Sequence, residues 1–142
     1  MKKIGVFYWS GTGNTEAMAN AIGSGISKEG VEFDLINVSD GTGDIGQYET
    51  LMFGCPSMGS EELEESEFAP FFDQVESSLS GKKVALFGSY GWGDGEWMRT
   101  WQDRVSSAGA ELFKGEGLII NETPDDAGIA QCEEFGSSFA KL

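Results

Sequence analysis

The sequence predicts an α/β fold in which a doubly wound parallel sheet carries helices on both faces. Short apolar runs predict five strands, at residues 4–9, 33–38, 51–55, 84–88 and 117–121. Apolar residues at helical spacing occupy the segments between these runs. A chain that alternates strand and helix builds a parallel sheet, and the nearly continuous apolar character of the runs indicates strands that are mostly buried on both faces.

Four helices are expected, because apolar residues recur every three or four positions in four segments. The four apolar faces consist of Met18, Ile22 and Ile26; Phe68, Phe71, Phe72, Val75 and Leu79; Trp97, Trp101, Val105 and Ala108; and Ile129, Cys132, Phe135 and Phe139. Gly30, Gly81 and Gly109 stand where helices should end. We expect Trp97 and Trp101 to lie in the core.

Two further segments shape the expected organisation of the chain. Residues 39–48 connect the second and third strands and are long enough only for a brief helix. The acidic segment 61–67 is expected to open the next helix as a solvated first turn, because carboxylates complement the positive end of the helix dipole. A length of 142 residues fits a single domain that spans residues 1–142.

The chain is strongly acidic. It contains 9 Lys and Arg residues, 24 Asp and Glu residues and no His, which gives a formal charge of −15. Such a surface repels nucleic acid and anionic membranes, so the expected partners are basic proteins. The absence of histidine removes the commonest general base and metal ligand, which disfavours a hydrolase and a metal site.

The two cysteines and the start of the chain indicate the expected location. Cys55 and Cys132 lie far apart and belong to no Cys-x-x-Cys pattern, which disfavours a disulfide framework or a zinc site. Cys55 is expected to be a buried residue at a strand end. The first apolar run is too short for a signal peptide, and no run approaches the length of a membrane span. A reducing cytoplasm is therefore expected.

The first apolar run leads into short donor side chains and glycines, with no lysine or arginine among them: Ser10, Gly11, Thr12, Gly13, Asn14 and Thr15. A Rossmann fingerprint would need glycine at Glu16, and a Walker loop would need Gly-Lys-Ser or Gly-Lys-Thr. At a helix N-terminus, hydroxyl, amide and backbone N–H groups can surround a phosphate monoester without a countercharge. The alternative is an ordinary capped turn, since Ser, Thr and Asn are common N-cap residues.

Three stretches, YWSGTGNTE, GCPSMGSEELEESEF and GKKVALFGSYGWGDGEWM, resemble the short-chain bacterial flavodoxins over essentially the whole chain and with matching spacing. The resemblance implies a flavodoxin-like five-stranded sheet of order 2-1-3-4-5. It also implies a monomeric, low-potential one-electron carrier that holds FMN non-covalently and shuttles electrons between basic redox partner proteins. Such a carrier is not an enzyme and turns over no substrate of its own.

The loops after the third and fourth strands complete the expected flavin site, with Pro56, Ser57, Met58, Gly59, Ser60 and Glu61 in one loop and Ser89, Tyr90, Gly91, Trp92 and Gly93 in the other. The thioether of Met58 and the indole of Trp92 are suited to be the two apolar walls of a flavin. By resemblance, the Glu61 carboxylate would accept a hydrogen bond from flavin N3–H. The N–H groups of Gly91 and Gly93 would face the O2 and N1 region.

The resemblance also implies roles for smaller groups of these loops. Ser89 would meet the ribityl chain, and Ser57, which follows Pro56, lies where some relatives place a phosphate-contacting serine. In the family, the turn 58–61 is thought to reverse its central peptide on reduction, so that the Gly59 carbonyl faces the flavin. Positive φ would then pass from Gly59 to Ser60.

Several alternatives compete with this interpretation. Taken singly, Met58 could be loop packing and Trp92 an exposed loop aromatic, while Trp9 is expected to pack near the phosphate loop. A receiver domain needs Asp at the end of strand three and Lys after strand five, where this chain has FGCPS and IINET. A low-molecular-weight phosphatase needs Cys-x5-Arg, and Glu61 stands at the arginine position after Cys55. The serious rival is an FMN-dependent NAD(P)H or quinone reductase, which usually has longer loops and forms oligomers.

Overall fold

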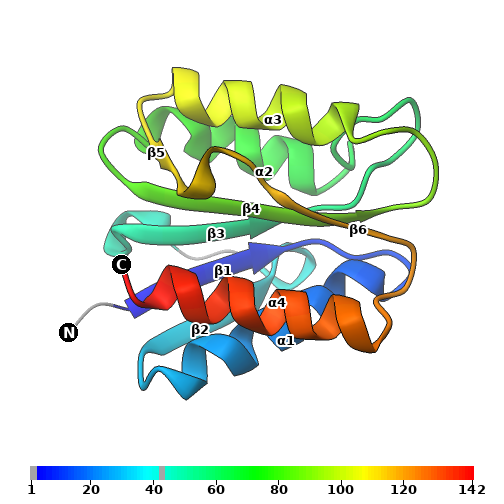
Figure 1. The fold of residues 1–142 in the computed structure, drawn as a ribbon. Helices are drawn as coiled ribbons and strands as arrows, with labels where there is room; N and C mark the ends of the chain where they lie inside the picture. Colours follow the sequence, from blue (N-terminus) through cyan, green and yellow to red (C-terminus); the bar gives the residue numbers. More distant parts are fainter. Residues whose placement is uncertain (1–2, 42–43) are drawn as a thin grey trace.

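The computed structural model describes residues 3–41 and 44–142 and contains a parallel sheet with helices on both faces (Figure 1). The strands are β1 (Lys3–Tyr8), β2 (Glu32–Asn37), β3 (Thr50–Gly54), β4 (Lys83–Tyr90), β5 (Glu111–Leu112) and β6 (Leu118–Asn121). The α-helices are α1 (Asn14–Lys28), α2 (Phe68–Val75), α3 (Glu96–Ser107) and α4 (Asp126–Ala140). The strand order is β2-β1-β3-β4-β5, with β6 also paired to β4, which confirms the expected fold class.

The fifth position of the sheet holds two short strands instead of the single strand predicted at residues 117–121. β5 pairs with the start of β4, where Glu111 lies opposite Lys83. β6 pairs with the end of β4, where Asn121 lies opposite Tyr90. The sequence interpretation missed β5 because this strand is only 2 residues long and contains no apolar run.

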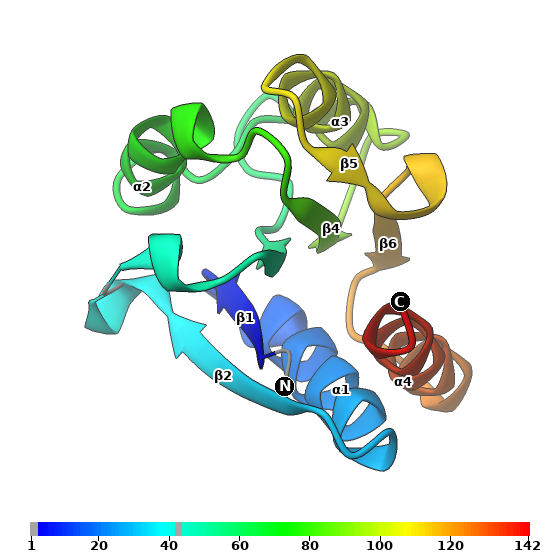
Figure 2. The ribbon, with the colours of Figure 1, turned by 90° about the vertical axis from the view of Figure 1, so that its left-hand side faces the viewer.

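The helices form one layer on each side of the sheet (Figure 2). α1 and α4 cover one face, and α2 and α3 cover the other. Trp97 and Trp101 are 2% and 1% exposed, which confirms that both are core residues. Of the predicted helix faces, Ala108 and Ile129 are partly exposed and the other members are buried.

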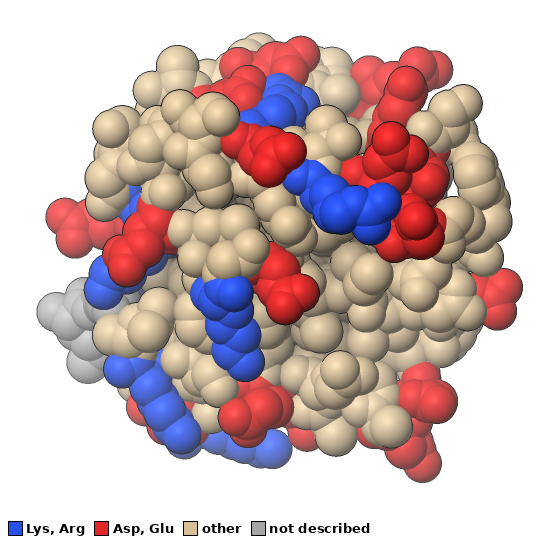
Figure 3. All heavy atoms as spheres, turned by 45° about the horizontal axis from the view of Figure 1, so that its top comes forward, with Lys and Arg blue, Asp and Glu red and all other residues tan. Residues whose placement is uncertain are grey.

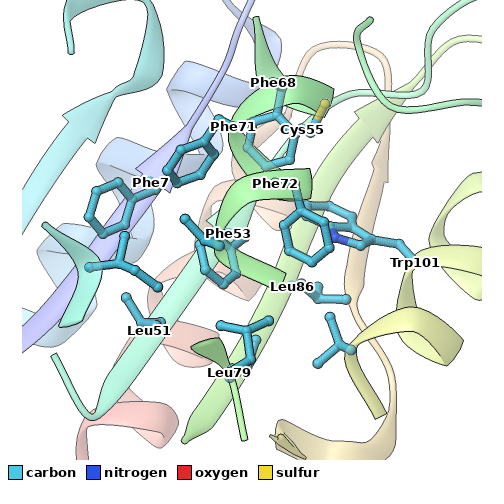
Figure 4. Packing of buried hydrophobic residues seen from close by; sticks show 14 of the residues in the cluster. Phe7, Leu51, Phe53, Cys55, Phe68, Phe71, Phe72, Leu79, Leu86 and Trp101 are labelled. Atoms are coloured by element: carbon cyan, nitrogen blue, oxygen red, sulfur yellow. The ribbon is translucent and has the colours of Figure 1, made fainter. Parts of the chain in front are cut away.

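Aromatic side chains fill the layer between the sheet and helices α2 and α3 (Figure 4). Phe7 of β1 stacks on Phe71 of α2, with 5.6 Å between ring centroids. Phe68 and Phe72 each make a T-shaped contact with Trp101 of α3. Aromatic pairs in such geometries stabilise a core beyond the area they bury. This layer fixes α2 and α3 on the sheet and thereby positions the loops that precede them.

Helices α1 and α4 approach each other closely through glycines. A Cβ atom at Gly25 would lie 1.9 Å from the carbonyl oxygen of Glu133, and one at Gly136 would lie 2.1 Å from that of Ile22. Any side chain at either position would therefore push the two backbones apart. The close contact joins α1, which follows the first strand, to α4, which follows the last.

The connection between β2 and β3 contains short 3-10 helices at Val38–Asp40 and Ile45–Gln47. This agrees with the expectation of only brief helix in residues 39–48, of which residues 42–43 lie outside the described part of the chain. No helix within residues 3–41 or 44–142 is long and apolar enough to cross a membrane.

Lysines and carboxylates are unevenly distributed over the molecule. The described lysines lie at the end where the strands begin and the helices end: Lys3, Lys28, Lys82, Lys83, Lys114 and Lys141. On the face drawn in Figure 3, basic side chains lie mostly toward the left, whereas acidic ones predominate on the right, where the strands end. Within the described residues, Arg99 in the first turn of α3 is the cation at that acidic end, and its guanidinium is paired with Asp94 at 2.9 Å.

Candidate functional site

The loops that follow β1, β3 and β4 meet at the carboxyl edge of the sheet and are joined by hydrogen bonds. In doubly wound sheets, ligands bind outside this edge, where the strand order reverses. Here the reversal lies between β1 and β3, which run side by side in the sheet. The sequence-predicted site residues therefore lie at one end of the molecule, at the position where the fold class places ligands.

The loop after β1 surrounds a set of backbone donors. Ser10 Oγ accepts hydrogen bonds of 3.2 Å from the N–H groups of Gly13 and Glu16, and Gly13 adopts a left-handed conformation with φ of 97°. Within the described residues, four other backbone N–H groups make no hydrogen bond: those of Gly11 and Thr12 in the loop, and those of Asn14 and Thr15 at the start of α1. Unpaired N–H groups at the positive end of a helix form a fitting cradle for a phosphate.

Thr15 and Ser89 contribute to the site from a buried position. Their hydroxyl oxygens lie 2.8 Å apart, and the residues are only 1% and 4% exposed. The hydroxyl of Thr15 is thus engaged with Ser89, and its backbone N–H is the donor that it offers to the loop. This contact ties the start of α1 to the end of β4.

The loop after β3 begins as a small hairpin. Met58 and Glu62 exchange two backbone hydrogen bonds of 2.8 Å, and the turn between them has positive φ at Gly59 (54°) and Glu61 (57°). Ser60 is not among the residues with positive φ. Met58 is 39% exposed at this edge and leaves apolar surface open to a ligand.

Pro56 and Ser57 lead from β3 into this hairpin, and both are partly buried. The Ser57 N–H donates to the Ser89 carbonyl at 2.9 Å, which extends the β3–β4 pairing beyond the strand. The Ser57 hydroxyl makes no hydrogen bond within the described residues. Cys55, just before them, is 0% exposed, which confirms it as a buried strand-end residue, and burial raises the pKa of its thiol.

The Glu61 carboxylate links the loop after β3 to the loop after β4. Its Oε1 atom accepts from the N–H groups of Gly95 (3.3 Å) and Glu96 (3.1 Å) at the start of α3. A Cβ at Gly93 would lie 2.4 Å from Glu61 Cδ, so the carboxylate rests on the bare backbone of this glycine. Oε2 makes no hydrogen bond within the described part of the chain and can still accept one from a ligand.

The loop after β4 presents an exposed indole and unused backbone donors. Trp92 is 63% exposed, and the N–H groups of Gly91 and Gly93 have no partner among the described residues. Large hydrophobic side chains are exposed at only three described positions, Met58, Trp92 and Leu142, and two of these belong to the predicted site. Tyr90 packs against Trp97 beneath the loop, with 5.8 Å between ring centroids.

Glu64 has a structural role that the sequence interpretation missed. The carboxylate accepts three backbone hydrogen bonds, from Ser66 (2.8 Å), Glu67 (2.7 Å) and Phe68 (2.8 Å). Burial raises the pKa of Glu64, but these N–H donors outweigh it and hold the pKa below its ordinary value. Residues 61–67 therefore precede α2 and do not form its first turn as expected, because the Glu64 carboxylate reaches forward to cap the start of the helix at Phe68.

No feature of the acidic run distinguishes Glu64 from its neighbours, so the sequence alone could not identify this cap.

Trp9 is held beside the loop after β1 by a second glutamate of the run: the Trp9 Nε1 atom donates to Glu67 Oε1 at 2.8 Å. A Cβ at Gly11 would lie 2.9 Å from the Trp9 ring, which confirms that this indole packs beside the predicted phosphate loop.

A fourth loop, after β6, also reaches the site and was not among the three predicted. Within it, the Glu122 N–H donates to the Tyr90 carbonyl at 2.7 Å, and the Thr123 hydroxyl donates to Asn14 Oδ1 at 2.8 Å. The polar stretch NETPDD between a strand and a helix was a usable signal. Carboxyl ends of parallel strands share one edge of a sheet, so this stretch had to lie near the other loops.

Comparisons with known proteins agree with this geometry. A family model described as Flavodoxin matches residues 6–136. The chain is 45% identical over 139 residues to the flavodoxin of Megasphaera elsdenii, across 97% of this chain and 98% of that protein. It is 47% identical over 138 residues to the flavodoxin of Clostridium beijerinckii, across 96% of this chain and 99% of that protein.

A solved structure shows the same agreement in three dimensions. The solution structure of the two-electron reduced Megasphaera elsdenii flavodoxin has a TM-score of 0.87 with this chain and covers 98% of it, and this chain in turn covers 99% of that structure. Sequence and fold thus match over nearly the whole length. The chain belongs to the flavodoxin family, whose members bind FMN and act as electron carriers, not as enzymes.

Proposed function

We propose that this chain holds FMN non-covalently at the carboxyl edge of the sheet, with the phosphate in the loop after β1 and the ring between Met58 and Trp92. One observation carries the proposal: unused N–H donors at and just before the start of α1 lie at the same edge of the sheet as two exposed apolar side chains, Met58 and Trp92. Bound FMN supplies a ring that can take up and release electrons one at a time.

The residues divide into three groups by the part of FMN that they would contact. Hydrogen-bond donors for the phosphate come from Ser10, Gly11, Thr12, Gly13, Asn14 and Thr15, with Pro56 and Ser57 beside them. Met58 and Trp92 are apolar walls, Glu61 Oε2 is an acceptor for N3–H, and the Gly91 and Gly93 N–H groups are donors for the O2 and N1 region. Gly59, Ser60, Ser89 and Tyr90 shape the loops that hold the ring and the ribityl chain.

The acidic surface supports a carrier of low potential that docks basic redox proteins. Carboxylates close to the site disfavour the addition of negative charge to the bound ring. They also attract positively charged partner surfaces. We further propose that the chain acts as a single-domain monomer in the cytoplasm, in keeping with its charge and with the burial of both free cysteines.

Reconstitution with different flavins tests the cofactor site. A loop built from neutral donors suits a terminal phosphate monoester, so FMN should bind far more tightly than riboflavin, which lacks the phosphate, or FAD, in which the phosphate is part of a diphosphate. Titration of the flavin-free protein with each ligand, followed by flavin fluorescence, measures the three affinities. Equal affinities would show that the loop does not recognise the phosphate.

Stepwise reduction tests the carrier role against the reductase alternative, which the comparisons do not favour. Absorption spectra recorded during reductive titration should resolve two separate one-electron steps, the second at low potential. Rapid oxidation of NADPH by the purified protein alone would instead support a reductase.

A further inference from the structure

The loop after β6 holds the side chain of Asn14. The Thr123 hydroxyl donates a hydrogen bond of 2.8 Å to Asn14 Oδ1 across 109 residues of sequence. Because the amide oxygen is turned toward Thr123, the amide nitrogen is turned away from it. The Nδ2 atom makes no hydrogen bond within the described residues, so its two donors remain available to a ligand in the loop after β1.

The backbone around Thr123 is held in place from the other side of the site. Glu122 adopts φ of 57°, a left-handed conformation that is unfavourable for a residue with a Cβ atom. Its N–H donates to the Tyr90 carbonyl at 2.7 Å, and Asn121 Nδ2 donates to the same oxygen at 3.1 Å. Strained conformations persist where surrounding bonds enforce them, and they cluster at functional sites. Residues 121–123 thus join the end of β4 to the start of α1.

Each neutral donor matters for an anion in these surroundings. The loop after β1 contains no lysine or arginine, the chain carries a formal charge of −15, and the Arg99 guanidinium is engaged by Asp94. A phosphate there is held by hydrogen bonds alone. Donation by a hydroxyl to an amide oxygen polarises the amide and strengthens its N–H donors, because hydrogen bonds in a chain reinforce one another.

On the basis of the proposed FMN site, we infer that Thr123 is a positioning residue for the phosphate: its hydroxyl orients and polarises the Asn14 amide so that Nδ2 donates to the phosphate oxygens. Thr123 does not touch the flavin ring in this arrangement. Its effect is therefore specific to ligands that carry the phosphate, and it depends on Asn14.

Paired measurements with FMN and riboflavin test this inference. Dissociation constants are obtained from the flavin fluorescence that appears when the loaded protein is diluted, for the wild type, Thr123→Val, Thr123→Ser, Asn14→Ala and the Thr123→Val/Asn14→Ala double variant. Thr100→Val, at an exposed residue of α3, is the matched control. Melting of each variant without flavin reports whether it is folded.

Thr123→Val should weaken FMN binding by about three- to tenfold, the range of one hydrogen bond, and leave riboflavin binding unchanged. Thr123→Ser and Thr100→Val should bind both ligands like the wild type, and the double variant should bind FMN no more weakly than Asn14→Ala. Equal weakening of both ligands, no weakening, or additive effects with Asn14→Ala would overturn the inference. A wild type that binds riboflavin as tightly as FMN would instead overturn the proposed phosphate site itself.

Discussion

Glu64 shows how one residue in a run of similar residues acquires a separate role. It is 7% exposed, whereas Glu62 and Glu65 on either side are exposed. Its N–H donates to Cys55 Sγ at 3.4 Å, and its carboxylate caps α2, so it anchors the loop after β3 to the core. A carboxylate that accepts several backbone hydrogen bonds is stabilised in its charged form.

Glu64→Gln should therefore lower the free energy of unfolding at neutral pH. The variant should also lose less stability than the wild type as the pH falls. Because the pKa of Glu64 is depressed by folding, its contribution is fully present above the ordinary value of about 4.3 and is lost as pH falls through the lower folded pKa. The expected loss at pH 7 is about 1–3 kcal/mol, the usual cost of impairing buried hydrogen bonds. Urea unfolding between neutral and acidic pH measures it.

The control for this experiment is Glu65→Gln, which removes the same charge from an exposed neighbour. This variant should unfold within about 0.5 kcal/mol of the wild type at pH 7. If Glu64→Gln and Glu65→Gln gave the same unfolding curves at every pH, the cap would contribute nothing to stability.

Ser60→Gly tests the turn reversal implied by the family. Gly59 has φ of 54° and Ser60 is not in the left-handed region, which is the starting turn that the reversal requires. After reversal Ser60 would need positive φ, at a cost of about 1 kcal/mol for a residue other than glycine. Ser60→Gly should therefore raise the potential of the first electron by tens of millivolts in a redox titration. A first potential that stayed unchanged or fell would contradict this account.

Residue types predict which groups could bind FMN, but they do not show which neighbours hold those groups in place. Met58 and Trp92 are predicted as apolar walls because thioether and indole groups pack well on a flavin ring, and Ser10 is predicted as a donor for its phosphate because it is a hydroxyl at a helix N-terminus. The hydrogen bonds of Glu64 and Thr123 could not be predicted in this way, because the N–H groups that Glu64 accepts from and the Asn14 side chain that Thr123 contacts come near only on folding. The sequence shows which donors and acceptors are present, but not which of them form hydrogen bonds with one another.

At the scale of elements, the close contact between α1 and α4 predicts a change in stability whose sign is opposite to the one that helix propensity predicts. Gly136→Ala should destabilise the protein by about 1–3 kcal/mol, because the added methyl group would lie 2.1 Å from the Ile22 carbonyl oxygen. Propensity alone favours alanine over glycine within a helix by about 0.5–1 kcal/mol. Thermal and urea unfolding of the variant decide between the two signs.

Gly128→Ala in the same helix is the matched control. A Cβ at Gly128 would find its nearest neighbours at 3.4 Å, an ordinary contact distance, and the N–H bond to Asp125 would be kept. This variant should be as stable as the wild type or slightly more stable. A Gly136→Ala protein as stable as Gly128→Ala would show that the two helices can separate without cost.

Strands could be predicted from the sequence where the run of apolar residues was several residues long. The apolar runs located β1, β2, β3, β4 and β6 to within one or two residues at each end. β5 was not predicted, because a two-residue strand is defined by its pairing with β4. The local sequence does not show which residues will pair with a neighbouring strand. The predicted start of α2 was wrong for a related reason: the Glu64 carboxylate caps the helix at Phe68, four residues further along the chain, and residues 65–67 form turns.

For the whole molecule, charge should control the second reduction potential. Each carboxylate about 10 Å from the ring disfavours added negative charge by about 1–2 kcal/mol at an effective dielectric constant near 20, before salt screening. The double substitution Glu62→Gln/Glu65→Gln should therefore raise the potential of the second electron by tens of millivolts. Glu64 is left intact because its cap would confound the result.

The control for charge is Glu49→Gln/Glu111→Gln, which alters net charge equally at the start of β3 and β5, the opposite end of the sheet. Potentials of both double variants are measured at low and at high salt. The shift for Glu62 and Glu65 should exceed that of the control and shrink as salt is added. Equal shifts would mean that net charge, and not proximity, sets the potential.

The placement of the described lysines at the end opposite the candidate site gives the molecule an electric dipole whose negative pole is the end that carries the site. In the field of a cationic protein, such a dipole experiences a torque before any atoms touch. With a basic partner of the kind proposed, the molecule should turn its site end forward, so that a larger fraction of encounters brings the site toward the partner. This alignment fades beyond the Debye length of about 8 Å at physiological ionic strength. We therefore expect lysines that touch nothing in the site to influence how fast the chain associates with a basic partner.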